Sequence, residues 1–319
     1  MSVLTYSREV LAIASIVGLV AGPLGAGTVS AQPAHVQRQD PALGAEIRKI
    51  NAYTALMNRT LAVAESWRRY ASWVDMRIGP TGRERFISYG LYRLADVSRE
   101  LAAARQAMAD PPSRPELDQA VGRYILAYET LAPLINRAER YYARQDYRAD
   151  GLAEGQELHR QMVPAAEAYH AAREGLERQM RQVRADLDRR ELADLEAREG
   201  RLVRWQLRNT IVRARAVIDV LSAAGQQPVD LAALDEAIAG YVAAIREMER
   251  YSVRNPEGLS SFEGQAGAWL GRLRAFREAL GLTDGDLRRV AHDATWLLET
   301  YNSLVSLART SMPIPTIGR

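Results

Sequence analysis

Apolar residues recur at every third or fourth position along most of the chain, which is the spacing of side chains on one face of an α-helix. The pattern is clearest between Lys49 and Tyr92, where many of the repeated side chains are aromatic. The first half of this stretch carries one such row at Tyr53, Leu56, Thr60, Val63, Trp67, Tyr70 and Val74. A second apolar row lies beside it, so we expect a helix that is buried against more than one neighbour.

This first helix is predicted to end near Ile78, because Pro80 lacks an N–H and disfavours the helical conformation in the residue before it. Thr81 and Glu84 have the spacing of a capping box, which predicts that a second helix begins there and runs back to Ala109. A turn this short would leave the two helices antiparallel and in contact.

The same periodicity predicts further helices along the rest of the chain. We expect them at residues 113–142, 158–187, 202–221, 230–248, 260–280 and 283–308. Ser113 with Glu116 and Ser260 with Glu263 have the spacing of capping boxes, and Asp230 is a predicted N-cap. The charged stretch over residues 189–200 leaves the boundary between two long helices open.

No segment alternates apolar and polar residues as a strand does, and no Asn-Gly hairpin turn occurs. The fold class is therefore predicted to be all-α, a mostly antiparallel bundle of about eight helices. A single domain is expected over residues 43–311, because no long linker interrupts the pattern. Residues 32–42 are expected to form a flexible leader and residues 312–319 a frayed tail.

Residues 1–31 have the features of a secretory signal peptide. Arg8 precedes an apolar run over residues 10–20, and Ala31 closes a site of small residues that is typical of cleavage. An uncleaved anchor is the alternative, since the uncharged stretch is nearly long enough to span a bilayer. Pro23 and the small residues favour cleavage, so we expect a soluble periplasmic or secreted protein.

Composition removes several classes of partner. The 42 basic and 39 acidic residues leave a net charge of +3, and arginines alternate with acids along every predicted helix. A nucleic-acid surface would need them concentrated on one face. Lys49 is the only lysine, which we interpret mainly as compositional bias. With no cysteine, the chain has no disulfide and no lipid anchor on a cysteine is expected.

Catalytic and metal-binding motifs are not found in the sequence. His159 and His170 stand eleven positions apart, too far to hold one ion as an HExxH pair does. Gly-x-Ser-x-Gly, P-loop and Gly-x-Gly-x-x-Gly motifs are missing, so no catalytic residue, metal or cofactor is predicted. The paired carboxylates Asp186 with Asp188, and Asp284 with Asp286, could in principle do acid–base work. Because they lie in charged surface or capping contexts, we interpret them as part of a solvated face.

The most interesting residues are aromatic and polar. If the end of the first helix and the start of the fourth meet beside the turn over residues 78–82, they bring together Trp73, Asp75, Tyr141, Tyr142, Tyr147 and His159. Such a cluster could bind a sugar or peptide. The alternative, which the pattern favours, is that these aromatic side chains only close the end of the bundle.

The chain resembles the YiiG-like family of bacterial envelope proteins (domain-of-unknown-function family 3829). The resemblance rests on Lys49 to Tyr53, Tyr70 to Asp75, Gly79 to Gly82, Tyr89 to Tyr92, Tyr141-Tyr142, Gln145 to Tyr147, Gly155 to His159 and Tyr301 to Leu304. It implies an all-helical envelope protein and carries no catalytic motif. Family members are often lipoproteins, whereas this chain has no cysteine to acylate.

These observations predict a periplasmic helical protein with a non-enzymatic binding or scaffold role in the cell envelope. Its partner would be a small ligand, a glycan or an envelope protein. An enzyme that acts on envelope polymers through a carboxylate or arginine site is one alternative. An oligomeric assembly built through the long helices of residues 157–222 is another.

Overall fold

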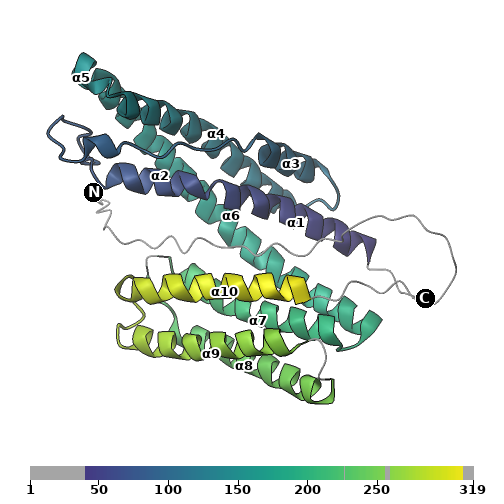
Figure 1. Cartoon of the computed structure of the whole chain (residues 1–319). Helices are drawn as coiled ribbons and strands as arrows, with labels where there is room; N and C mark the ends of the chain where they lie inside the picture. The colour runs from purple at the N-terminus through teal and green to yellow at the C-terminus, as the bar shows by residue number, and fades with distance from the viewer. Residues whose placement is uncertain (1–39, 226, 256–258, 312–319) are drawn as a thin grey trace. The chain divides into compact units, whose positions relative to one another are not determined.

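The computed structural model describes residues 40–225, 227–255 and 259–311, and these residues form helices and loops with no β-strand (Figure 1). The predicted all-α class is confirmed. The predicted signal peptide, most of the leader and the tail lie outside the described residues. Residues 41 and 42 were assigned to the leader but already belong to the first helix.

By their internal contacts the helices fall into two compact units, whereas one continuous domain over residues 43–311 stays a prediction. Among the described residues, the N-terminal unit spans residues 48–182, and the C-terminal unit comprises residues 183–311 together with residues 40–47 at the start of α1. The N-terminal unit contains most of α1 (Pro41–Arg59), α2 (Leu61–Ala71), η1 (Ile87–Tyr89), α3 (Ser98–Ala109), α4 (Pro115–Arg144), α5 (Tyr147–Asp150) and the first part of α6 (Ala153–Glu199). The C-terminal unit contains the rest of α6, α7 (Val203–Ala224), α8 (Leu231–Arg254), α9 (Ser260–Gly281), η2 (Leu287–Val290) and α10 (Ala291–Ser311).

The predicted first helix is two helices, because the chain bends at Thr60. The bend leaves carbonyl groups that need other partners. The Arg173 guanidinium donates to the Met57 carbonyl at 3.2 Å, and the Tyr169 hydroxyl donates to the Thr60 carbonyl at 3.1 Å. Both donors come from α6, so α6 fixes the bend by hydrogen bonding as well as by packing.

The helix predicted to begin at Thr81 does not form, and the next α-helix begins at Ser98. Glu84 does accept from the Thr81 amide, which is one half of a capping box, and also from the Thr81 hydroxyl and the Gly82 amide, but the Thr81 hydroxyl accepts from the Arg83 amide. These bonds close an isolated turn instead. Only η1 follows it, and Gly90 ends η1 with a φ of +53°, a conformation that a helix cannot contain.

Helix α6 runs without interruption through Pro164 and through the charged stretch whose helix boundary the sequence left open. It ends at Gly200, which has a φ of +76°. Asp230 caps α8 as predicted, accepting from the Ala232 and Ala233 amides at 3.0 Å. The capping box predicted at Ser113 and Glu116 does not form. Helix α4 begins at Pro115, and no side chain caps its first turn.

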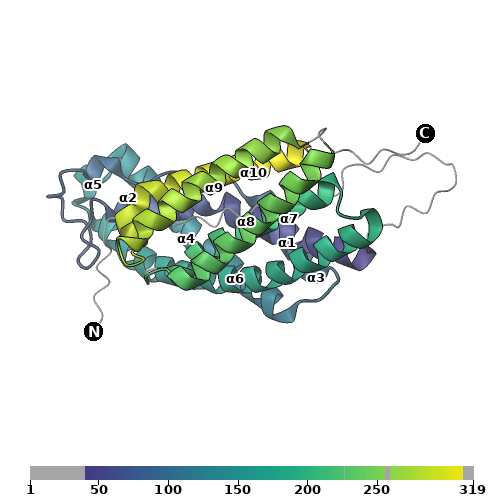
Figure 2. The ribbon, with the colours of Figure 1, turned by 90° about the horizontal axis from the view of Figure 1, so that it is seen from below.

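In the C-terminal unit, four helices close into a ring. Helix α7 packs on α8, α8 on α9, α9 on α10 and α10 on α7 (Figures 1 and 2). Trp269 is buried between these four helices and donates from its indole nitrogen to the Leu297 carbonyl at 3.2 Å. The Tyr241 ring meets the Trp269 indole edge-on, with ring centres 4.8 Å apart, and the centre of the Tyr301 ring lies 5.9 Å from that of Trp269. These contacts make an ordinary apolar bundle core.

The second part of α6 is held to α7 by buried charges. Asp188, only 4% exposed, accepts from Arg208 at 2.7 Å and from Arg215 at 2.9 and 3.0 Å. Glu191 pairs with Arg208 at 2.5 Å. The interpretation of Asp188 as a solvated surface charge was therefore wrong, because a carboxylate on a charged helix can face a neighbouring helix that supplies arginines.

Replacing Asp188 with alanine is expected to lower the free energy of unfolding by about 3–5 kcal/mol, because two guanidinium groups would stay buried with one carboxylate fewer. Asp186, on the exposed side of the same helix, pairs with Arg189 at 3.1 Å and is the matched control. Asp186→Ala should cost roughly 0.5 kcal/mol or less. Denaturant unfolding of both variants measures this, and equal losses would contradict the assignment.

Candidate functional site

The predicted aromatic residues do come together, at the end of the N-terminal unit where α2, α4 and α6 meet the loop over residues 72–97. We call this group the buried aromatic cluster; it comprises Tyr70, Trp73, Tyr141, Tyr142 and His159. Trp73 meets Tyr70 edge-on at 5.1 Å and Tyr142 edge-on at 5.0 Å. Tyr141 meets Tyr142 at 5.0 Å in the same geometry.

His159 from α6 completes the cluster. Its Nδ1 lies 3.0 Å from the Tyr70 hydroxyl, within hydrogen-bond distance. Burial lowers the pKa of His159 below its usual value, although a hydrogen bond with the Met76 backbone and the charge of Asp75 act in the opposite direction. Burial also raises the pKa of Tyr70, with a further contribution from Tyr142. Burial thus favours the uncharged form of both groups, which form a hydrogen-bonded pair inside the cluster.

Two of the predicted residues stand apart from the buried ones. Tyr147 on α5 is half-buried, with its ring 6.2 Å from that of Tyr142 and 6.5 Å from that of Tyr141. Asp75 is exposed and its carboxylate accepts from the Arg77 amide at 2.9 Å. The carboxylate therefore shapes the turn that leads into Gly79.

The ring faces of Trp73, Tyr141 and Tyr142 are covered by their neighbours, with exposures of 8%, 2% and 1%. A ligand could reach them only by displacing the loop above them. Closing the end of the unit is therefore the role that this geometry supports best for the buried aromatic cluster. The binding role predicted for its residues stays a prediction.

The same loop presents a second set of aromatic side chains outward, which we call the aromatic row: Phe86, Tyr89 and Tyr92. They are 39%, 49% and 49% exposed. Phe86 and Tyr89 stack with ring centres 4.9 Å apart. The Arg69 guanidinium from α2 lies 4.3 Å from the centre of the Tyr92 ring and 5.5 Å from that of Tyr89. Arginine and exposed rings thus form one continuous surface.

The backbone under the aromatic row is fixed by side chains from two helices and from Trp73 at the start of the loop. Ser66 on α2 accepts from the Tyr92 amide at 3.1 Å and donates to the Tyr92 carbonyl at 2.9 Å. Asn136 on α4 accepts from the Leu94 amide at 2.9 Å. The Trp73 indole donates to the Gly90 carbonyl at 2.9 Å. Buried residues therefore hold the exposed row in place.

The turn at Gly79 is fixed to α6 in the same way. Gln156 on α6 donates to the Pro80 carbonyl. Gly79 has a φ of +78°, and a Cβ there would lie 2.9 Å from both the His159 ring and the Gln156 side-chain oxygen. Only glycine allows so close an approach in this conformation.

The sequence contained the aromatic row but not in a form that identified it. Phe86, Tyr89 and Tyr92 lie in the stretch that the spacing of Thr81 and Glu84 assigned to a returning helix, so they were not recognised as an exposed loop surface. The repeated glycines at 79, 82 and 90, all of which have positive φ, were the signal for a loop.

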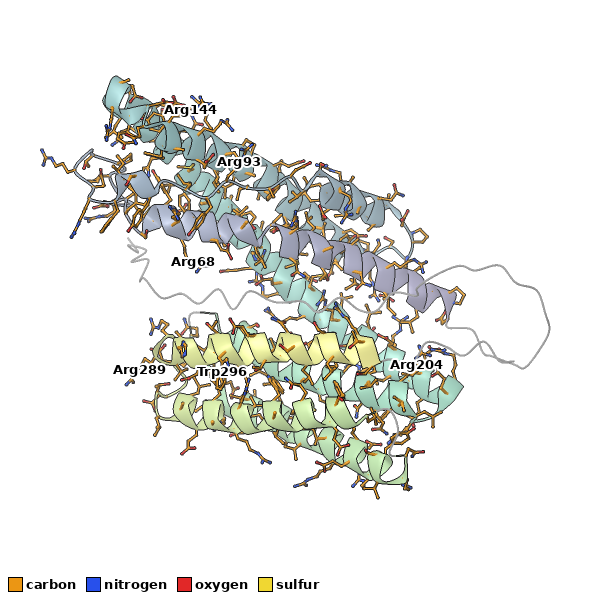
Figure 3. All side chains as sticks on the ribbon, in the orientation of Figure 1. Arg68, Arg93, Arg144, Arg204, Arg289 and Trp296 are labelled. Carbon is orange, nitrogen blue, oxygen red and sulfur yellow. The ribbon has the colours of Figure 1, made fainter. Side chains whose placement is uncertain are left out.

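We also searched the described residues for a concentrated basic surface, a cluster of metal ligands and a membrane-spanning helix. Arg68, Arg93 and Arg144 project from three different elements of the N-terminal unit, so arginines are spread over its surface (Figure 3). Among the described residues, no three potential metal ligands come together. None of the described helices combines the length and apolar content needed to cross a bilayer.

Replacing Gly79 with alanine should destabilise the N-terminal unit by more than the roughly 1–2 kcal/mol that a left-handed conformation costs a residue with a Cβ. Gly151→Ala is the matched control, because Gly151 has a φ of +59° but no atom within 4 Å of an added Cβ. Denaturant unfolding should give the larger loss for Gly79→Ala. Equal losses would show that Gly79 does not pack against α6.

Comparison with known proteins places the chain in a family. The profile of the DUF3829 family, described as proteins of unknown function, matches residues 45–305. Over 188 residues the chain is 29% identical to the uncharacterized protein YiiG of Escherichia coli (strain K12), an alignment that covers 54% of this chain and 50% of YiiG. The chain thus spans about half the length of this curated relative, and no solved structure matches. Because the profile covers most of its length, the chain belongs to the DUF3829 family.

Proposed function

We propose that the protein is a non-enzymatic binding protein of the bacterial cell envelope, and that the aromatic row on the loop over residues 72–97 is the surface that it offers to a partner. The observation that carries the proposal is the outward exposure of Phe86, Tyr89 and Tyr92 on a backbone that buried side chains hold in place. Contiguous aromatic surface exposed to water is uncommon on monomeric proteins and marks sites where a partner binds.

The composition of the row supports a protein partner. Tyrosine, phenylalanine and arginine are enriched in protein interfaces, and tyrosine and arginine dominate their energetic centres. Small-molecule sites are concave, whereas Phe86, Tyr89 and Tyr92 are all substantially exposed. Because the loop is already ordered, binding would lose little conformational entropy there. An envelope protein is therefore the partner that these residues favour.

The envelope location rests on the first 31 residues and on the family resemblance. When the full chain is expressed with its own leader in a Gram-negative host, the purified protein should have the mass of a chain that begins at Gln32. The small residues before Gln32 form a cleavage site. Recovery from the periplasmic fraction should accompany that mass. An intact mass that still contains residues 1–31, with the protein in the membrane fraction, would favour the anchor and contradict this prediction.

The aromatic row can be tested in cells that make the protein naturally. A photo-crosslinking amino acid in place of exposed Ser88, beside Tyr89, should give one discrete adduct with an envelope protein. The same group at exposed Ser306 on α10 is the matched control and should give no such adduct. Tyr89→Ala and Tyr92→Ala should each weaken binding of the purified partner by about 2 kcal/mol, or ~30-fold.

Both tyrosine side chains are half exposed, so the alanine variants should keep the unfolding midpoint of the parent protein. Loss of the adduct at an unchanged midpoint would support the proposal. An adduct that persists when both tyrosines are replaced, or that appears equally at Ser306, would overturn it.

A further inference from the structure

A groove of about 500 Å³ lies along α6, α7 and α8 in the C-terminal unit, and the proposed function does not use it. One wall is the exposed side of α6 around Leu192 and Ala193. The opposite wall is α8, where Gly240, Ala243 and Ala244 present almost no side chain. The volume is within the ~300–1,000 Å³ range of small-molecule sites.

The floor of the groove is one face of α7. Trp205, Asn209 and Arg213 follow one another at intervals of four residues, so their side chains lie in a line along the helix. Gly240 leaves room beside this line, since a Cβ added there would lie 3.8 Å from the Arg213 side chain. The groove therefore offers an indole, an amide and a guanidinium in sequence.

These three polar groups lack partners within the described part of the chain. The Trp205 indole nitrogen is buried without a hydrogen-bond acceptor, although the residue is only 6% exposed. Asn209 is also 6% exposed, and no hydrogen bond of its amide is found among the described residues. Arg213 likewise has no ion pair among them. Of the three groups only the Trp205 indole nitrogen is fully buried, whereas the Arg213 side chain is exposed to solvent. Arg213 and Asn209 are therefore the groups that a ligand in the groove can reach, and a ligand that accepts from both would give them the partners they lack.

The charged side chains around the groove indicate what net charge a ligand should carry. Arg189 pairs with Asp186 at 3.1 Å, on the same helix. Arg201, whose guanidinium lies 4.6 Å from the centre of the Trp205 ring, pairs with Glu196 at 2.9 Å and Glu247 at 2.8 Å.

Of the three arginines that line the groove, Arg213 is the one without an acidic partner among the described residues, while both glutamates line the groove. A single negative charge would complement Arg213. A dianion would be repelled by the glutamates.

We propose that this groove binds a small organic monocarboxylate with a flat apolar body. The carboxylate accepts from Arg213 and from the Asn209 amide, in the geometry that a guanidinium and a carboxylate prefer. The apolar body lies between Leu192 and Ala193 of α6 and Ala243 of α8, while the Trp205 ring, covered by Arg201, forms the base of the groove. The site is separate from the aromatic row, and neither proposal depends on the other.

Titration calorimetry of the mature chain with 2-naphthoate, and with its neutral analogue 2-naphthamide, tests the proposal. The carboxylate should bind saturably and the amide at least ~10-fold more weakly, because loss of one charged hydrogen bond costs about 1.5–3 kcal/mol. Arg213→Gln should weaken binding of the carboxylate by the same factor. Arg274→Gln, an exposed arginine on α9, removes the same net charge and should leave binding unchanged.

A second pair of variants separates the groove from general surface binding. Gly240→Leu should fill the groove and abolish binding, whereas Gly267→Leu on α9, where an added Cβ meets nothing within 4 Å, should not. If Gly240→Leu does not fold, the comparison of Arg213→Gln with Arg274→Gln decides. Equal binding of acid and amide, equal binding by Arg213→Gln, or no saturable binding at millimolar concentration would overturn the proposal.

Discussion

The structure depends on one constraint, which is that polar groups buried by α6 must find partners. In the N-terminal unit, Tyr169 and Arg173 donate to carbonyls that the bend at Thr60 leaves free. In the C-terminal unit, Asp188 holds Arg208 and Arg215 beside α7. A long helix with many charged side chains would otherwise be a poor core element. The pairing explains how α6 contributes to the core of each unit while remaining a single helix.

The same principle orders the loop over residues 72–97. A long segment without regular structure normally leaves backbone groups to water, but here Ser66, Trp73 and Asn136 bind the backbone of the loop at residues 90–94. The buried aromatic cluster beneath it supplies the packing, with Trp73 linking the cluster to Gly90. The buried aromatic cluster therefore helps to fix the loop that carries the exposed aromatic row. A surface prepared in this way before any partner arrives is what a binding protein needs.

Sequence periodicity was sufficient for the fold class, for most helices and for the cap at Asp230, because these depend on residues close together in the chain. It could bring Trp73, Tyr141, Tyr142 and His159 to one end of the bundle only by assuming that the helices run antiparallel, because these residues are distant in the chain. Sequence periodicity failed where contacts between residues distant in the chain determine the local structure. The helix expected at Thr81 is replaced by a loop whose backbone is held by other helices, and Asp188 is buried because α7 supplies its arginines. The aromatic row and the polar groove both depend on such contacts, so periodicity alone could not define them.

Hydrogen exchange of backbone amides in the loop over residues 72–97 tests the central claim most directly, since the proposed binding surface requires an ordered loop. The Tyr92 amide bonds Ser66 and the Leu94 amide bonds Asn136. Both should exchange far more slowly than in an unstructured peptide of the same sequence, as amides within α2 and α4 do. Exchange of both at the rate of the unstructured peptide would show that the loop is not held by the helices, and would contradict the account.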